Sequence, residues 1–167
     1  TAGNQGRLVA ILPQQAKFRV DPRDDGRFDG WYQPDWEDDD WEVLPTTRPF
    51  FADGRHLDPS GFPYLGALWY RLEVDVPAIA AGQPVRLHAL AAETEAWVWV
   101  NGQFVGHRPY LDAYLRPAPI DLDVTKALKP GATNSVVIRT ISVEDSLMED
   151  THRSDAAWRI HSLTASS

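Results

Sequence analysis

The sequence contains no cysteine. This absence excludes disulfide bridges and thiolate metal sites, but it leaves the cellular compartment open because a core of this size can be stable without covalent cross-links. The sequence also lacks any apolar run near the roughly 20 residues that span a bilayer. Basic residues are in the minority, with 16 lysines and arginines against 24 acids and a net charge of -8. Because such a chain repels a phosphate backbone, we expect neither a nucleic acid nor a membrane as its partner.

Motifs of catalysis are missing as well. The sequence has no G-x-S-x-G elbow, no P-loop, no H-E-x-x-H pair and no cysteine nucleophile. Two carboxylates for glycoside hydrolysis could be drawn from 24 acids, but abundance alone is no evidence for such a pair. We therefore expect a non-catalytic chain, with a small stand-alone hydrolase or lyase as an alternative. Residues 1–6 contain neither an initiator methionine nor an export signal, so we expect a piece excised from a longer protein.

Aromatic and turn-forming residues are abundant. Seven Trp, five Tyr and six Phe accompany 13 Pro and 11 Gly, a composition that favours an all-β fold. The 167 residues fit one domain, 1–167, that is large enough for a hydrophobic core. Segments rich in β-branched and aromatic residues predict strands at 69–76, 85–89, 96–100, 103–105, 135–141 and 158–163.

The patterning of two of these segments predicts how they are buried. In 69–76, apolar residues alternate with charged ones, which is typical of a strand that is exposed on one face. Residues 96–100 are apolar on both faces and therefore indicate a central strand. Asn101-Gly102 follows directly and tolerates the positive φ angles of a type I′ turn, so we expect a hairpin that returns through 103–105.

The remaining segments predict turns and loops. Residues 123–128, which Pro130-Gly131 stops, indicate a single helical turn. The polar, acidic stretch 21–40 and the segment 50–66 are expected to be irregular loops, and the turn at 38–41 is expected to lead Trp41 back to the core. Of the other aromatics, we expect burial of Trp69, Trp97, Trp99 and Trp158, and exposure of one among Trp31, Tyr32 and Trp36.

Three motifs in order resemble a known family: Trp69-Tyr70-Arg71, residues 96–107 around Asn101-Gly102, and residues 121–134. Together they resemble the N-terminal sugar-binding jelly-roll domain of family 2 β-galactosidases and β-glucuronidases, within the galactose-binding-like superfamily. Residues 18–21, 30–31, 39–41 and 157–160 are also similar, although Ala156-Ala157 replaces the usual Gly-Gly or Ser-Gly.

The resemblance implies a fold and a setting. It implies an all-β protein, an antiparallel β-sandwich of the jelly-roll, galactose-binding-domain-like type. In that family the catalytic glutamates lie on a TIM barrel that would follow this domain, so the resemblance implies a non-catalytic accessory domain beside the catalytic domain of a parent enzyme. We expect that parent to be a carbohydrate-active enzyme, either a glycoside hydrolase or a polysaccharide lyase. It further implies a bacterial protein, an extracellular or periplasmic location, and a polysaccharide or oligosaccharide as ligand.

Two loops carry the residue types that bind sugars, which are flat aromatics beside side chains that hydrogen-bond hydroxyl groups. One loop runs over 107–114 and the other over 144–155. The alternatives are that the tyrosines of the first loop only cover the sandwich edge, and that the second loop is a solvated insert. The candidate carbohydrate-binding residues are His107, Tyr110, Asp112, Tyr114, Asp145, Asp150 and Arg153.

No metal site can be located in the sequence. Residues 21–26 superficially match a calcium loop, but Arg23 and Tyr32 occupy ligand positions, so an EF-hand is rejected. The five histidines lack metal-ligand spacing. No cofactor is expected, while the resemblance remains compatible with a structural calcium ion. A purely structural domain that packs on a catalytic domain is the main alternative to sugar binding, and it predicts a contiguous exposed apolar patch rather than a polar cleft.

Overall fold

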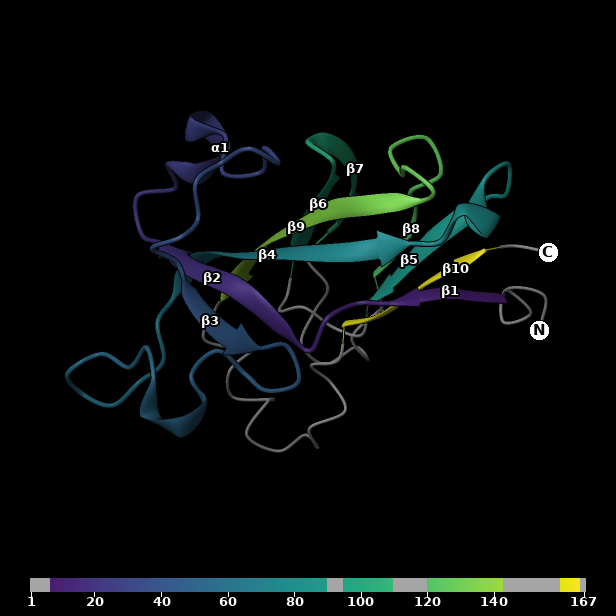
Figure 1. Cartoon of the computed structure of the whole chain (residues 1–167). Coiled ribbons are helices and arrows are strands. Elements are labelled where there is room, and N and C mark those ends of the chain that lie inside the picture. The colour runs from purple at the N-terminus through teal and green to yellow at the C-terminus, as the bar shows by residue number, and fades with distance from the viewer. Residues whose placement is uncertain (1–6, 90–94, 110–119, 143–159, 166–167) are drawn as a thin grey trace.

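The computed structural model describes residues 7–89, 95–109, 120–142 and 160–165. Its strands form two antiparallel sheets that pack face to face (Figure 1). The four-stranded sheet has the order β1-β10-β5-β8, and the six-stranded sheet has the order β3-β2-β4-β9-β6-β7. The predicted all-β antiparallel sandwich is therefore confirmed. The strands are β1 (Arg7–Ile11), β2 (Gln15–Asp21), β3 (Glu42–Pro45), β4 (Gly66–Val76), β5 (Val85–Ala89), β6 (Ala96–Val100), β7 (Gln103–Arg108), β8 (Ile120–Asp123), β9 (Ala132–Ser142) and β10 (Ile160–Ala165).

Helical structure among the described residues is limited to short pieces. They are α1 (Gly26–Asp29) and the 3-10 turns η2 (Ala52–Gly54) and η3 (Ala78–Ala80). No helix in this part of the chain has the length and apolar character needed to cross a bilayer. The loops expected at 21–40 and 50–66 are observed, apart from α1 and η2.

The main core lies between the two sheets. Alternate residues of β5 point inward, so that Val85, Leu87 and Ala89 are buried. Strands β5 and β6 have the predicted bounds, whereas β4 begins three residues earlier than expected and β10 runs over Ile160–Ala165. The larger core side chains with almost no exposed surface are Leu12, Phe18, Phe50, Leu68, Leu87, Val98, Val100, Ile120, Ile138 and Leu163.

The hairpin predicted at Asn101-Gly102 is present. Both residues have positive φ, 50° and 80°, as a type I′ turn requires. The Asn101 side chain donates to Ala127 O at 2.8 Å and to Asn134 Oδ1 at 2.7 Å, and its Oδ1 accepts from the Ser135 backbone amide. The hairpin is thus tied to the turn after β8, where Leu128 N donates to Val124 O and closes the one expected helical turn.

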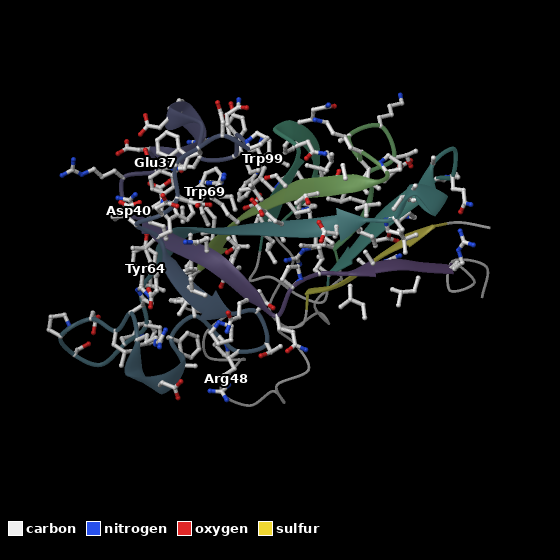
Figure 2. All side chains as sticks on the ribbon, viewed as in Figure 1. Glu37, Asp40, Arg48, Tyr64, Trp69 and Trp99 are labelled. Atoms are coloured by element: carbon white, nitrogen blue, oxygen red, sulfur yellow. The ribbon has the colours of Figure 1, made fainter. Side chains whose placement is uncertain are left out.

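The outer face of the six-stranded sheet carries a second, aromatic core. Residues 22–41, which include α1 and which we call the cover segment, lie over this face (Figure 1). Trp31 of the cover segment lies 5.8 Å from Trp69 of β4, which in turn stacks on Trp99 of β6 at 5.3 Å. Figure 2 shows Trp69 and Trp99 on the cover-segment side of the sheet. The cluster consists of Trp31, Trp41, Trp69, Trp99 and Val137, flanked by half-buried Tyr32, Trp36 and Trp97.

This second core corrects two expectations. The strand 69–76 is exposed on its outer face only at Glu73 and Asp75, because the cover segment buries Trp69 and Arg71. The expected exposure of one among Trp31, Tyr32 and Trp36 is also wrong, since Trp31 is buried and the other two are half-buried. The burial predicted for Trp41, Trp69 and Trp99 is confirmed, and Trp158 lies outside the described residues.

Two charged residues hold the cover segment in place. Asp21, at the end of β2, accepts hydrogen bonds from the backbone amides of Asp25 and Gly26 and from Trp69 Nε1, all within 2.8–2.9 Å. Arg71 of β4 donates from Nε to Asp38 at 2.9 Å and from its two Nη groups to three backbone carbonyls of the cover segment. Because both side chains are buried and fully engaged, the loops over this face have a defined position.

Candidate carbohydrate-binding site

Strand ends gather at one end of each sheet. In the four-stranded sheet, Ala89 is paired with both Ile120 and Ile160. In the six-stranded sheet, Ala96 is paired with Arg108 and Thr140, and β9 ends two residues later at Ser142. These ends, which we call the rim, flank the three internal segments that lie outside the described residues. The predicted binding loop 107–114 begins at the rim with His107, and the predicted loop 144–155 lies outside the described residues.

His107 is the predicted site residue that the structure describes. It lies on β7, and its ring stacks on Trp97 with centroids 4.8 Å apart and an interplanar angle of 12°. Its Nε2 lies 2.6 Å from Glu95 Oε1, and the two side chains are 36% and 26% exposed. The imidazole is therefore fixed by stacking and by one carboxylate while part of it stays accessible to a ligand.

A row of side chains extends from His107 across the outer face. The strand register places Trp97 beside His107 on one side and beside Arg139 of β9 on the other. The guanidinium of Arg139 lies 4.3 Å from the centroid of the Trp97 ring, a cation–π contact. The indole lies between these two neighbours, so its role is structural. Trp97 is only half-buried, however, so the full burial predicted for it from the sequence is wrong, because β6 is covered at this point by His107 and Arg139 and not by the core.

Arg139 connects the row to the start of the cover segment. Its Nη2 donates to Asp24 at 2.8 Å, and Asp24 also pairs with Arg27 at 2.6 Å. Nearby on β9, the buried hydroxyls of Thr140 and Ser142 have no hydrogen-bond partner among the described residues, nor has Arg139 Nε. Unsatisfied buried polar groups cost about 1–3 kcal/mol each, so this end of β9 is a place where additional partners would be stabilising.

The arrangement has both donors and acceptors at the rim. The partly exposed pair combines a donor, His107, with an acceptor, Glu95, whereas Arg139 donates to Asp24 from a buried position. Sugar hydroxyls both donate and accept hydrogen bonds, so the chemistry suits a hydroxylated ligand. Within the described ranges, no group of three or more His, Cys, Asp or Glu side chains could hold a metal ion. A structural calcium ion therefore stays a prediction.

The other predicted site residues cannot be placed in this arrangement. They lie outside the described residues, and their role in sugar binding stays a prediction: Tyr110, Asp112, Tyr114, Asp145, Asp150 and Arg153.

Sequence reasoning missed Glu95, Arg139 and Asp24. The row around Trp97 was missed partly because of a β-bulge between Val98 and Trp99. Regular pairing from the Asn101 turn would set Trp97 opposite Gly106 rather than His107. The signal that could have identified Arg139 is the alternation within 135–141, which puts it on the same face as Val137.

Comparison with known proteins shows which solved structures share this fold. No family model and no curated sequence matches the chain. Solved structures do match: the β-glucuronidase from Ruminococcus gnavus in complex with uronic deoxynojirimycin has a TM-score of 0.68 and 25% identity over 83% of this chain. Its apo structure and its complex with D-glucuronic acid each give 0.69 and 24% identity over 83% of this chain. The chain spans only 22–23% of the length of that enzyme. The resemblance to β-glucuronidases predicted from the sequence is confirmed.

Proposed function

We propose that this chain is an accessory domain of a larger glycoside hydrolase, and that it binds carbohydrate at the rim without catalysing hydrolysis. The likeness to a β-glucuronidase over less than a quarter of that enzyme supports the accessory role. A bacterial source is consistent with the likeness to a Ruminococcus gnavus enzyme, and an extracellular or periplasmic setting is proposed from the family resemblance alone.

The proposed binding site rests on one observation. His107 is half-exposed, is stacked on Trp97 and is held by Glu95 at 2.6 Å, so it is positioned before any ligand arrives. A preorganised group loses little conformational entropy on binding, and this favours ligand recognition. The predicted loop 107–114 begins with His107, so we propose that Tyr110, Asp112 and Tyr114, which lie outside the described residues, contribute to the same site.

The test is a titration of the full chain with neutral and acidic oligosaccharides, with and without calcium, followed by calorimetry. We expect His107→Ala to weaken binding about tenfold, since a lost hydrogen bond to a charged or polar group is equivalent to roughly 1.4 kcal/mol. His88→Ala is the matched control, because His88 is also half-exposed and lies 3.5 Å from an acid, Asp121, on the other sheet. Equal losses in both variants, or no binding by the unmodified chain, would contradict the proposal.

A purely structural domain is the competing function, and it predicts one continuous apolar patch. The exposed large apolar side chains of the described residues are instead spread over separate elements. Leu8 and Ile11 lie on β1, Phe28 on α1, Val43 on β3 and Phe104 on β7, while Leu57 and Leu65 lie in the segment between β3 and β4 (Figure 1). This distribution favours ligand binding over the loss of a large partner surface.

A further inference from the structure

The outer face of the six-stranded sheet has two hollows beside the acidic turn of the cover segment. One hollow, of about 280 Å³, lies over β2, β3, β4 and β9, and Asp38 forms part of its wall. The other, of about 510 Å³, is lined by Arg19, Trp36, Glu37, Asp39 and Asp40. We call them the strand hollow and the tryptophan hollow.

The two hollows adjoin. Lys17 lines the strand hollow and Arg19 lines the tryptophan hollow, and they are successive outward residues of β2. Outward residues of a strand lie about 7 Å apart, a spacing that one glycosidic linkage can bridge. Figure 2 shows Glu37 and Asp40 of the dividing turn at the same end of the sheet as Trp69.

The wall between the hollows is held firmly. Arg71, which is 7% exposed, donates to Asp38 Oδ2 at 2.9 Å, to Gln33 O at 2.9 Å and to Trp36 O at 3.3 Å. The floor of the strand hollow consists of strand residues, which are more rigid than loop residues. Both hollows are therefore shaped before a ligand binds.

The tryptophan hollow combines an indole with carboxylates. Trp36 is half-buried against Trp31, with centroids 6.3 Å apart, and its Nε1 has no hydrogen-bond partner among the described residues. The carboxylates of Glu37 and Asp39 also lack described partners. Arg19 makes a long contact of 3.9 Å to Asp40, and its guanidinium lies 5.1 Å from the centroid of the Trp31 ring. An aromatic ring beside free acceptors is the combination that binds the apolar face and the hydroxyls of a pyranose.

The strand hollow offers both donors and acceptors. Within the described residues, the side chains of Gln15, Lys17, Glu73 and Ser135 make no hydrogen bond or ion pair, and half-exposed Val43 adds an apolar contact. Two cations, Lys17 and Arg71, balance two anions, Asp38 and Glu73, so this hollow has no net charge. Its size is near the lower end of small-ligand sites and suits a single sugar ring.

The negative charge of the cover segment limits which sugars can bind beside it. The cover segment contains eight acids and two arginines, a net charge of -6 out of -8 for the chain. An acidic or sulfated sugar would be repelled, and no described cluster could hold a metal ion. We infer that this face binds an uncharged oligosaccharide of at least two residues, one ring against Trp36 and the next in the strand hollow. The inference rests on the proposed carbohydrate function but assigns a binding site away from the rim.

The experiment is calorimetry on the full chain with β-1,4-linked glucose, mannose and galactose oligomers of one to four residues, and with galacturonate oligomers of the same lengths. We expect at least one neutral dimer to bind about tenfold more tightly than its monomer, and the galacturonate oligomers to bind at least tenfold more weakly than the neutral ones. Glu73→Gln and Asp39→Asn should each weaken binding several-fold, and the double variant at least tenfold. Asp75→Asn is the matched control, because Asp75 is the next outward acid of β4 and lies outside both hollows.

The outcomes separate the two proposals. If neutral oligomers bind but the hollow variants keep full affinity while His107→Ala loses it, the site on the outer face is wrong and the rim site stands. If galacturonate binds as tightly as the neutral oligomers, the inferred ligand class is wrong. If no oligosaccharide binds, both proposals are wrong. Amide chemical-shift changes confined to 15–19, 36–43 and 71–73 on titration would support the outer-face site directly.

Discussion

Arg71 is the residue whose replacement should affect the protein most specifically. Its guanidinium is buried under the cover segment, donates to the Asp38 carboxylate and to the carbonyls of Trp31, Gln33 and Trp36, and lies 5.8 Å from the centroid of the Trp41 ring. In Arg71→Met, the packing volume is largely kept but these acceptors lose their donor. Breaking a buried ion pair by removing one partner costs about 3–5 kcal/mol, because the remaining charge is left uncompensated.

The effect should be measurable as a fall in thermal stability and as a local opening. A loss of 3–5 kcal/mol lowers the Tm of a domain of this size by roughly 6–20 °C. Since the cover segment buries four tryptophans in the outer cluster, its opening should shift tryptophan emission to longer wavelength before the far-UV circular dichroism of the sheets is lost.

Arg71→Lys serves as the matched control. Lysine keeps the positive charge but lacks the planar fork that reaches several acceptors, so we expect an intermediate loss. A Tm of Arg71→Met within 2 °C of the unmodified chain, with unchanged emission, would show that the cover segment does not depend on this side chain.

Three further predictions concern the same end of the sheet. Gly26→Ala should destabilise the fold by about 1–3 kcal/mol in urea unfolding, because a Cβ there would lie 2.7 Å from Trp69 Cε2. Asp21→Asn should cost about 1.5–3 kcal/mol in the same assay, because an amide replaces a charged acceptor of three hydrogen bonds. Burial, reinforced by the charges of Asp21 and Asp24, raises the pKa of Tyr64 to about 12. Since the unfolded chain ionises this phenol near pH 10, its contribution to stability should decline between pH 10 and 12, and Tyr64→Phe should remove one late step from the ultraviolet titration.

The strands that could be predicted are those with local signals. In β5 and β6, alternation or continuous apolar character and the adjacent turn residues are all contained in the segment itself. The Asn101-Gly102 reversal is equally local, since two positive φ angles can be inferred from residue type. By contrast, β3 and β8 have four residues each, too few to show a period, and they form by pairing with β2 and β5.

The burial of the outer face could not be predicted, because it depends on tertiary contacts. Alternation in 69–76 predicts a solvated outer face, and the acids of 21–40 predict solvated loops. Three contacts reverse both expectations, namely Asp21 to Trp69, Arg71 to Asp38 and Arg139 to Asp24, which bind the acidic loop to the sheet. Each joins residues between 33 and 115 positions apart, a separation that no local pattern encodes.

The surroundings of His107 in the candidate site also depend on tertiary contacts that the local sequence does not encode. Its residue type and its place after the hairpin identified it as a candidate, but its neighbours depend on a single bulge between Val98 and Trp99. The extra residue in β7 brings His107 beside Trp97, where it stacks, and within 2.6 Å of Glu95. Without the bulge the period-2 rule would reverse the faces of 106–108, direct His107 inward and leave Arg108 outside. Because Arg108 is in fact buried and Ala96 opposite it belongs to the main core, the bulge sets both the packing of the rim and the exposure of the histidine.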